Sequence, residues 1–535
     1  MTTYNISTAT AGLKYQLKQE LNGGAVFVKN SVVAYRLTTG AFTEITDIDY
    51  PSKHTYAVTS ITRTSNTATV TTTATNSLVT GDSVTIAGAS EADYNGTYTI
   101  TVTVAGSAFT YTVANSPSTP ATGTITAVGG RTTVPGVVYL DGYMFVQDTT
   151  GKICNSDSLD STAWGALNYI TPEKEPDAAV AIAKSLNYLC AFKKWDTEFF
   201  ADAGNPAPGS PLASVDSAYL KLGCATADSI IEFDGGIVFM SQRDGQQRSR
   251  EVHVLNGLTP KKISTPEVER LLNADDLATC YALYLSTAGH QFYVLTLKTS
   301  AITIVYDFNN GYWYQWTMVT AQNAQSIGTG NLTSSSGVAS CTLATHGFSD
   351  GDPVLIAGAN QSPYNGTVNI TYVNANTFTY TISGSPASPA TGTITATGYT
   401  ESYFAFVSYA QYNNLDLVLH ETNGTIYSLS PTTYLDDGVP INYILRLPNW
   451  DGGNMLRKTV NSLRLVGDRV SGTAYIRYSD DDQQTYANYR PIDLSAQSAA
   501  HWRWKMTRRR TYDIRYTENT ALGLEALEQD ATQGE

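Results

Sequence analysis

Short hydrophobic runs separated by turn residues recur along most of the chain and predict β-strands. Within residues 137–146, two apolar or aromatic runs flank Asp141-Gly142, a dipeptide that favours a tight hairpin because glycine accepts positive φ. The same pattern returns at residues 230–240 and 291–306. Short strands joined by tight turns are typical of a sandwich, a barrel or a propeller, so the pattern predicts an all-β fold.

Two segments rich in Thr, Ala, Ser, Val and Gly interrupt this pattern and repeat each other. The chain reads Gly-Asp-x-Val-x-Ile-Ala-Gly-Ala in both, and further stretches correspond: residues 81–89, 94–97, 109–112 and 120–126 match 351–359, 364–367, 378–381 and 389–395. Two copies so far apart in the chain indicate one mobile domain inserted twice rather than a solenoid. We expect each to be a small β module, Ig-like or barrel, at residues 59–129 and 326–398, inserted at loop tips.

Without the inserts, the rest of the chain divides into a core and a C-terminal β unit. The core would comprise residues 1–58, 130–325 and 399–435, and the C-terminal unit residues 436–535. At about 40–45 residues per four-stranded blade, the core is long enough for roughly six propeller blades. One helix is expected, with Thr265 as N-cap and Pro266 in its first turn, ending near Asn273.

Composition favours a protein that works outside cells. Only 15% of the residues are charged, with 33 Lys and Arg against 47 Asp and Glu, which gives a net charge of -14, while Tyr and Gly number 35 and 42. Five scattered cysteines form no C-x-x-C pair, so they predict buried free thiols, with no zinc site and no disulfide framework. The N-terminus lacks the features of a signal peptide and no apolar run reaches the length of a membrane span, which indicates synthesis in the cytoplasm.

No motif for catalysis stands out. The sequence lacks H-E-x-x-H, G-x-S-x-G and a Walker loop, and no cofactor is predicted. Residues 479–486 are similar to the Asp-box hairpin of sialidases and many non-enzymes, with Gln483 and Tyr486 in place of Gly and Trp. The run Asp480-Asp481-Asp482 is either a turn whose side chains bond backbone amides or a calcium ligand set, and we favour the turn.

The one basic tract of the chain spans residues 501–510. If it forms a strand, His501, Arg503 and Lys505 share one face, and Trp502, Trp504 and Met506 share the other. Three interpretations stay open: an edge hairpin with its apolar face in the core, a protein interface, or a contact with DNA phosphates. The candidate interface residues are Arg503, Lys505, Arg508, Arg509 and Arg510.

An ordered set of short motifs gives the chain a family resemblance. The most specific is residues 262–269, Lys-Ile-Ser-Thr-Pro-Glu-Val-Glu. The others, in order, are residues 139–143, 155–157 with Trp164, 175–177, 197–199 with 203–204, 256–260, 289–296, 306–307 and Trp313. With these motifs, the chain resembles the packaged-DNA stabilisation proteins of short-tailed bacteriophages, which form the tail hub or nozzle. The tail of that family also resembles the Trp- and Arg-rich tract here.

The resemblance implies a β-propeller core and a non-enzymatic role in the virion. It implies a homo-oligomeric ring, usually a hexamer, beneath the portal and adaptor, which continues the DNA channel, retains packaged DNA, serves DNA ejection and carries tail fibres, spikes or a needle. Duplex DNA would pass through the lumen without sequence-specific binding. The alternative is a carbohydrate-binding or carbohydrate-cleaving propeller, such as a tailspike or a sialidase-like enzyme, which would need two carboxylates held across a sugar.

Overall fold

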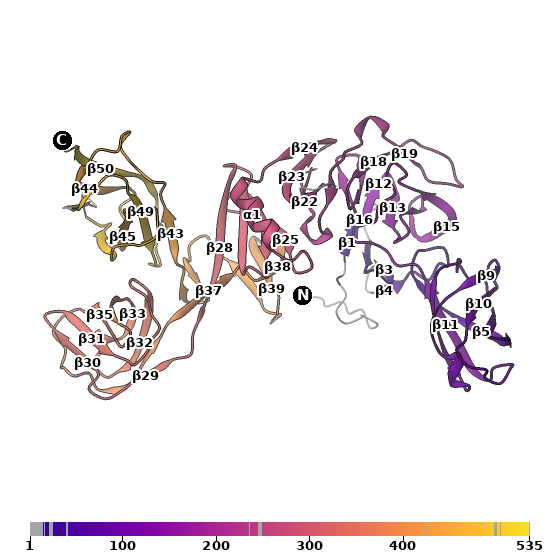
Figure 1. Ribbon diagram of the computed structural model, residues 1–535, viewed down its shortest axis with the longest axis horizontal. Coiled ribbons are helices and arrows are strands. Elements are labelled where there is room, and N and C mark those ends of the chain that lie inside the picture. Colours follow the sequence, from indigo (N-terminus) through magenta and orange to yellow (C-terminus); the bar gives the residue numbers. More distant parts are fainter. Residues whose placement is uncertain are drawn as a thin grey trace. The chain divides into compact units, whose positions relative to one another are not determined.

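A computed structural model gives the fold of the chain as almost entirely β-strand, in two compact units that are described separately. Unit 1 comprises Met1–Leu285, Gln291–Ser300 and Tyr306–Trp313, and unit 2 comprises Ser286–His290, Ala301–Val305 and Tyr314–Glu535. Figure 1 shows the strands of both units. The structure describes residues 14, 16–20, 25–38, 41–234, 236–243, 249–422, 424–496, 500–502 and 504–533.

Four small antiparallel sheets of unit 1 follow one another along the chain. The first contains β1 (Gln16–Gln19), β2 (Val26–Lys29), β3 (Ala34–Thr38) and β4 (Ala41–Glu44), and the second β12 (Val138–Leu140), β13 (Tyr143–Gln147), β14 (Ile153–Asp157) and β15 (Asp160–Ile170). The third contains β16 (Ala179–Ser185), β17 (Tyr188–Lys193), β18 (Thr197–Asp202) and β19 (Leu212–Ser214). The fourth contains β20 (Gly223–Cys224), β21 (Ile231–Phe233), β22 (Gly236–Gln242), β23 (Glu251–Asn256) and β24 (Thr259–Lys262). The 3-10 turns η2 (Asp216–Ala218) and η3 (Ala227–Ser229) lie between strands.

Two further sheets continue the series. The fifth has the order β25-β26-β27-β28-β37 and the sixth β38-β39-β40. Their bounds are β25 (Tyr281–Thr287), β26 (His290–Leu297), β27 (Ile302–Asp307), β28 (Tyr312–Ala321), β37 (Tyr399–Tyr403), β38 (Phe406–Tyr412), β39 (Leu415–His420) and β40 (Ile426–Leu429), followed by the pair β41 (Leu435–Asp436) and β42 (Val439–Pro440). The described residues outside the repeated segments and the C-terminal region thus form six sheets of three to five strands, besides the pair β41–β42.

The local sequence rules explain the hairpins and the helix. β12 and β13 pair with Leu140 opposite Tyr143, and both residues between them, Asp141 and Gly142, have positive φ, as the dipeptide predicts. The expected hairpins β21–β22 and β26–β27 also form. Helix α1 (Pro266–Ala274) begins where expected, with the backbone N–H of Val268 donating to the Thr265 hydroxyl.

The two repeated segments each fold into a β-sandwich. In the first module the strand order is β8-β7-β11-β5-β6-β10-β9, and β5 continues from one sheet into the other. In the second, β29-β36-β32-β33 and β30-β31-β35-β34 form two sheets around one core. The bounds are β5 (Lys53–Thr64), β6 (Thr67–Thr72), β7 (Ser83–Ala89), η1 (Ala92–Tyr94), β8 (Gly96–Thr99), β9 (Thr101–Val104), β10 (Ala108–Thr112), β11 (Gly123–Gly130), β29 (Gln325–Ile327), β30 (Leu332–Ser335), β31 (Val338–Thr342), β32 (Pro353–Ala359), η4 (Ser362–Tyr364), β33 (Gly366–Asn369), β34 (Thr371–Asn374), β35 (Thr377–Thr381) and β36 (Gly392–Thr397).

The residues that the modules share make the same contacts in both. The Asn95 side chain bonds both backbone groups of Ala89 at 3.0 and 2.8 Å, and Asn365 bonds those of Ala359 at 2.9 and 2.7 Å. Gly88 has a φ of +86°, and a Cβ there would lie 2.0 Å from the carbonyl oxygen of Thr124. Only glycine fits such a backbone approach, so the repeated glycine is a packing requirement.

Both modules leave and re-enter the chain between residues that lie side by side. At the first module, Lys53 in β5 pairs with Gly130 in β11, so β5 starts before the boundary expected at residue 59. At the second, Ala321 at the end of β28 pairs with Tyr399 at the start of β37. A domain whose two ends meet in this way interrupts its host at a single point.

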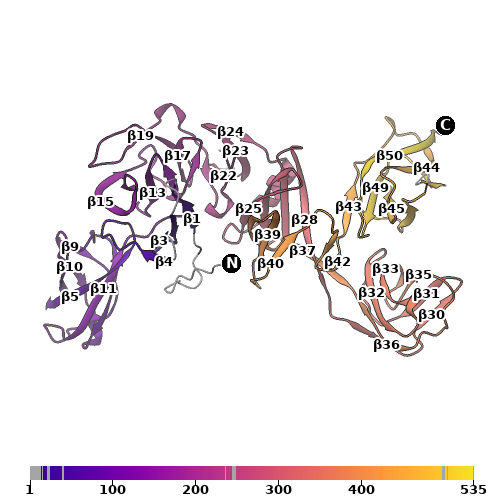
Figure 2. The same cartoon turned by 180° about the vertical axis from the view of Figure 1, so that it is seen from behind.

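The C-terminal residues form a separate sandwich inside unit 2, whose strands Figure 2 shows from behind. One sheet has the order β43-β49-β45-β46, and in the other β44 pairs with β50 on one side and with β47 and β48 on the opposite side. The strands are β43 (Tyr443–Arg446), β44 (Lys458–Gly467), β45 (Thr473–Ser479), β46 (Arg490–Asp493), β47 (Ala500–Trp502), β48 (Met506–Thr507), β49 (Thr511–Tyr516) and β50 (Leu524–Gln533).

All five cysteines are buried free thiols, as the sequence predicts. Burial raises the pKa of Cys154, Cys224, Cys280 and Cys341 to about 12 and raises that of Cys190 still further. Since the thiolate is the reactive form, these side chains are inert at neutral pH.

Candidate functional site

The basic tract near the C-terminus does not form the single strand expected of it. Trp502 of β47 pairs with Ser462 of β44, whereas Met506 of β48 pairs with Thr459, so the register shifts by one residue between them and the alternation of faces is interrupted. Trp504 is buried, with its ring 5.7 Å from that of Tyr478 and 6.1 Å from that of Tyr512. Met506, expected on the same buried face, is instead 56% exposed. The predicted apolar face is therefore wrong for Met506, and Arg503 lies outside the described residues.

The three adjacent arginines divide into two roles. Arg508 and Arg509 are exposed, and so is Lys505. Arg510 is fully buried: its Nε and Nη2 donate to the two carboxylate oxygens of Asp480 at 2.7 and 2.8 Å, and its guanidinium lies 4.0 Å above the ring of Tyr478. The proposal of Arg510 as an interface residue is corrected accordingly, because a side chain with no exposed surface cannot contact a partner.

The aspartate run preceding these arginines is organised as a turn. The amide and hydroxyl of Thr485 donate to Asp481, and these hydrogen bonds, the hydroxyl's first, lower the pKa of Asp481 to about 2. Asp480 binds Arg510, and Asp482 binds Arg509 at 2.7 Å. Each carboxylate thus has a partner within the protein. Across the described residues, no group of three His, Cys, Asp or Glu side chains is placed to hold a metal ion.

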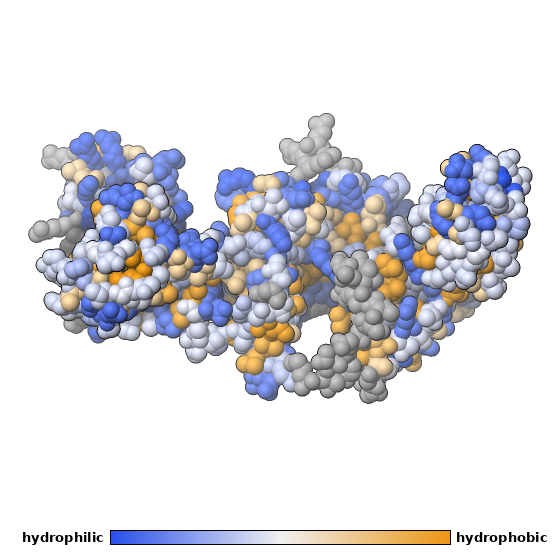
Figure 3. Space-filling view, turned by 90° about the horizontal axis from the view of Figure 1, so that it is seen from below, coloured by the Kyte–Doolittle hydropathy of each residue, from blue (hydrophilic) through white to orange (hydrophobic). Residues whose placement is uncertain are grey.

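A groove of about 580 Å³ lies beside this turn. The ammonium of Lys458 donates to the carbonyl oxygens of Asn454 and Leu456 at 2.6 and 2.8 Å, and so fixes the loop that forms one wall. The lining of the groove combines exposed methionines with cations and two aspartates: Met455, Arg457, Asp480, Asp482, Met506, Thr507, Arg508 and Arg509. Figure 3 shows that hydrophobic residues reach the visible surface in separate patches among hydrophilic ones. Exposed methionines next to arginines are a composition enriched in protein interfaces.

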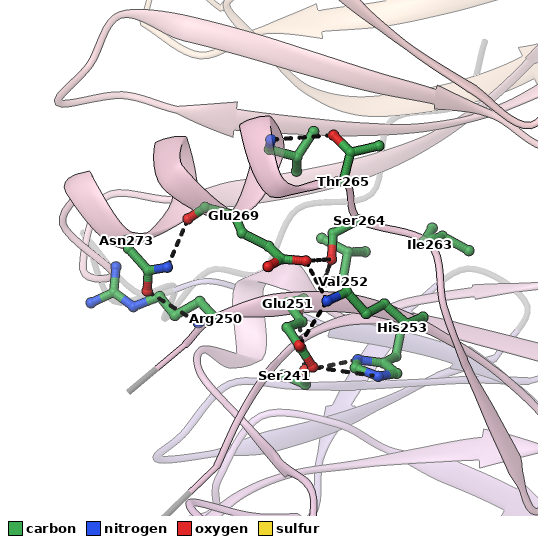
Figure 4. Close-up of polar contacts among 12 residues, drawn as sticks. Ser241, Arg250, Glu251, Val252, His253, Ile263, Ser264, Thr265, Glu269 and Asn273 are labelled. Atoms are coloured by element: carbon green, nitrogen blue, oxygen red, sulfur yellow. Dashed lines mark hydrogen bonds and ion pairs between the residues drawn. The ribbon is translucent and has the colours of Figure 1, made fainter. Parts of the chain in front are cut away.

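A second polar constellation lies in unit 1 and superficially resembles a catalytic triad (Figure 4). Ser241 Oγ lies 2.9 Å from His253 Nδ1, and His253 Nε2 lies 3.7 Å from a carboxylate oxygen of Glu251. Ser241 is fully buried and His253 nearly so, and burial lowers the pKa of His253 to about 4. A nucleophile must reach a substrate carbonyl, so a buried serine in this position serves to connect β22 with β23.

The same region explains the most specific motif of the sequence, residues 262–269. Lys262 bridges Glu251 at 2.9 Å and Glu269 at 2.6 Å. Ser264 Oγ lies 3.1 Å from a carboxylate oxygen of Glu269 (Figure 4). The indole N–H of Trp313, another residue of the resemblance, donates to the carbonyl oxygen of Ile263 at 2.8 Å. The motif therefore fixes α1 against β23 and β24.

The sequence did not predict a buried ion cluster around Lys193, although two motifs that contribute residues to it, 175–177 and 197–199, were noted. The Lys193 ammonium lies 3.5 Å from Asp177, 3.2 Å from Asp196 and 2.7 Å from Glu198. Burial is the main cause that raises the pKa of Asp196 to about 7. The motifs at residues 175–177 and 197–199 thus meet around one lysine, a pairing that only tertiary structure reveals.

A comparison with protein families matches residues 23–327 to the family described as phage stabilisation, bacteriophage P22 Gp10, beta-propeller. The match confirms the predicted fold class as an all-β fold that contains a β-propeller. No curated protein sequence matches the chain. The single α-helix of the described residues, nine residues long, is too short to cross a membrane.

Solved structures with some likeness belong to several classes. An exo-beta-1,3-galactanase from Phanerochaete chrysosporium has 10% identity and a TM-score of 0.24, over 75% of this chain and 97% of its own. A puromycin-hydrolysing peptidase of Mycobacterium tuberculosis has 12% identity and a TM-score of 0.25, over 87% and 58%. The phage phi92 endosialidase has 10% identity and a TM-score of 0.16, over 81% and 68%. At these scores the likeness carries no argument about function.

Proposed function

The chain belongs to the phage stabilisation family described as bacteriophage P22 Gp10, beta-propeller, and from this membership we propose that it is the tail hub, or nozzle, of a short-tailed phage. The main support for this proposal is the family match, which spans more than half of the chain. The protein is thus a phage tail β-propeller protein, and the narrower role as a hub is the proposal.

In this role the protein forms a ring, of six copies as is usual in such hubs, that continues the DNA channel below the portal and adaptor. It retains the packaged genome, carries fibres, spikes or a needle, and belongs to the mature virion. The two inserted modules decorate this ring. Catalysis has no part in the mechanism, and the burial of Ser241 and His253 in the triad-like arrangement supports that view.

The electrostatics favour passage of DNA over binding. A net charge of -14 per copy makes the ring acidic as a whole, whereas affinity for duplex DNA comes largely from cations that neutralise phosphates. A wall that binds DNA weakly allows fast ejection, so retention would depend on steric closure below the hub or on a balance of internal pressure. We expect a Kd weaker than about 1 µM for linear duplex at about 50 mM salt, where phosphate contacts are least screened.

The test is the assembly of phage particles in the absence of this protein. The proposal predicts filled heads that lose their DNA, and retention of the genome after the purified protein is added back. Particles that keep their DNA without it would contradict the hub role. Release of reducing sugar from host polysaccharide by the purified protein would instead support the carbohydrate-cleaving alternative.

A further inference from the structure

The second sheet of the C-terminal sandwich has two edges of opposite charge. β44 lies in the middle, β50 pairs with one side of it, and β47 and β48 pair with the other. β50 is ten residues long, and among the described residues it pairs with β44 alone. One row of its backbone donors and acceptors is therefore open to another strand.

The β50 edge is acidic. Glu525, Glu528 and Asp530 are exposed, while Leu524 and Leu527 pack against the core. The only cation recorded near these carboxylates within the described residues is Arg464, 3.8 Å from Glu528 and itself half-exposed. An exposed pair of this kind contributes little, so the edge keeps its negative character.

The opposite edge is basic and partly apolar. Met506 of β48 is 56% exposed, and Met455 across the groove is 55% exposed. Lys505, Arg457 and Arg508 are exposed and have no ion-pair partner among the described residues, while the two aspartates of the groove are already neutralised by Arg509 and Arg510. The groove thus offers apolar contact together with positive charge.

We propose that the groove lined by Met455, Met506 and Arg508 in one copy receives the acidic edge strand β50 of a second copy. The charges are complementary, and the methionine side chains suit a protein strand better than a phosphate backbone. Because groove and strand occupy opposite edges of one sheet, the contact is head-to-tail, and repetition of such a contact generates a closed ring where the rotation between copies closes. The inference rests on the proposed function, and it names the surface that joins the copies.

The test reverses charge on each edge of the full-length protein. The groove variant carries Arg508→Glu and Arg509→Glu, and the edge variant carries Glu525→Lys, Glu528→Lys and Asp530→Lys. Each variant should associate at least tenfold more weakly than the wild-type protein in sedimentation and in electron micrographs. A matched control, Lys221→Glu with Lys261→Glu, changes exposed lysines of unit 1 and should associate normally.

Restoration makes the test specific. An equimolar mixture of groove and edge variants should assemble, because each negative groove then meets a positive strand, and one chain with both sets of changes should also assemble. Rings from both single variants would overturn this contact while leaving the hub proposal intact. Failure of the mixture to assemble would overturn the pairing of these two surfaces. The pairing would also be overturned if the groove variant lost binding to duplex DNA but still formed rings. A wild-type protein that stays monomeric at all concentrations would instead contradict the ring itself.

Discussion

Replacement of Asp480 by Asn tests whether the buried arginine at residue 510 holds the C-terminal sandwich together. The change removes the charge that faces a fully buried guanidinium but preserves the shape of the side chain. Loss of one partner from a buried ion pair costs about 3–5 kcal/mol, since the other charge remains without compensation. The Asp480 side chain is itself 36% exposed, so water compensates in part, and we expect about 2 kcal/mol.

The neighbouring pair provides a matched control. Asp482→Asn breaks the contact with Arg509, in which both side chains are about half-exposed, and should cost less than about 1 kcal/mol. Arg510→Met leaves Asp480 with the hydroxyl of Thr507 and with solvent, and should cost about 1 kcal/mol. The expected order of destabilisation is therefore Asp480→Asn, then Arg510→Met, then Asp482→Asn.

Hydrogen exchange of the C-terminal sandwich in the intact chain measures these differences. The backbone N–H groups of Trp450 and Arg510, which donate to each other's carbonyl oxygens at 2.7 and 2.9 Å, report on opening near the ion pair. If Asp482→Asn lowers protection as much as Asp480→Asn, burial does not decide the energetics here, and the assignment of Arg510 as a structural residue is wrong.

Three further outcomes are expected. The folded state of unit 1 should lose up to roughly 3 kcal/mol of stability as the pH falls from about 6.5 to about 4, because the unfolded chain protonates His253 in that range while the folded chain does not. Hydrogen exchange of β22 and β23 should show this loss. His253→Gln should flatten the pH profile, whereas His54→Gln, at a partly exposed histidine, should not. Deletion of residues 54–129, with Lys53 joined to Gly130 through a short glycine linker, should leave a soluble, folded protein, and aggregation or loss of its melting transition would contradict the insertion. Gly88→Ala should destabilise the first module by about 3 kcal/mol, because the added Cβ meets the Thr124 carbonyl. Gly81→Ala, with open space around the added Cβ, should cost about 1 kcal/mol, and equal melting shifts for the two variants would refute the packing argument.

Local chemistry made much of the fold predictable. Asp141-Gly142 specifies a hairpin through backbone conformation alone, and Thr265-Pro266 marks a helix start through one hydrogen bond and one fixed dihedral angle. The repeated modules were visible because identical packing demands, such as that on Gly88, preserve identical residues. These features depend on a few neighbouring positions, and a sequence displays such positions directly.

The candidate site was less predictable because it depends on residues distant in the chain. Nothing local distinguishes Arg510 from Arg508, and only Tyr478 of β45 and Asp480 just after that strand determine which one is buried. The register shift between β47 and β48 likewise follows from which residues pair with β44, not from the alternation of side chains. Period-two reasoning holds along a continuous strand and fails where the strand is interrupted.

The burial of every cysteine makes this protein convenient for site-specific labelling. With the native thiols held in their protonated form by burial, one cysteine placed on the surface would be the main reactive thiol of the chain at neutral pH. A fluorophore attached to either edge of the C-terminal sheet would then report on its surroundings without removal of any native cysteine. Single-molecule records of a labelled particle could follow this protein while the genome leaves the head.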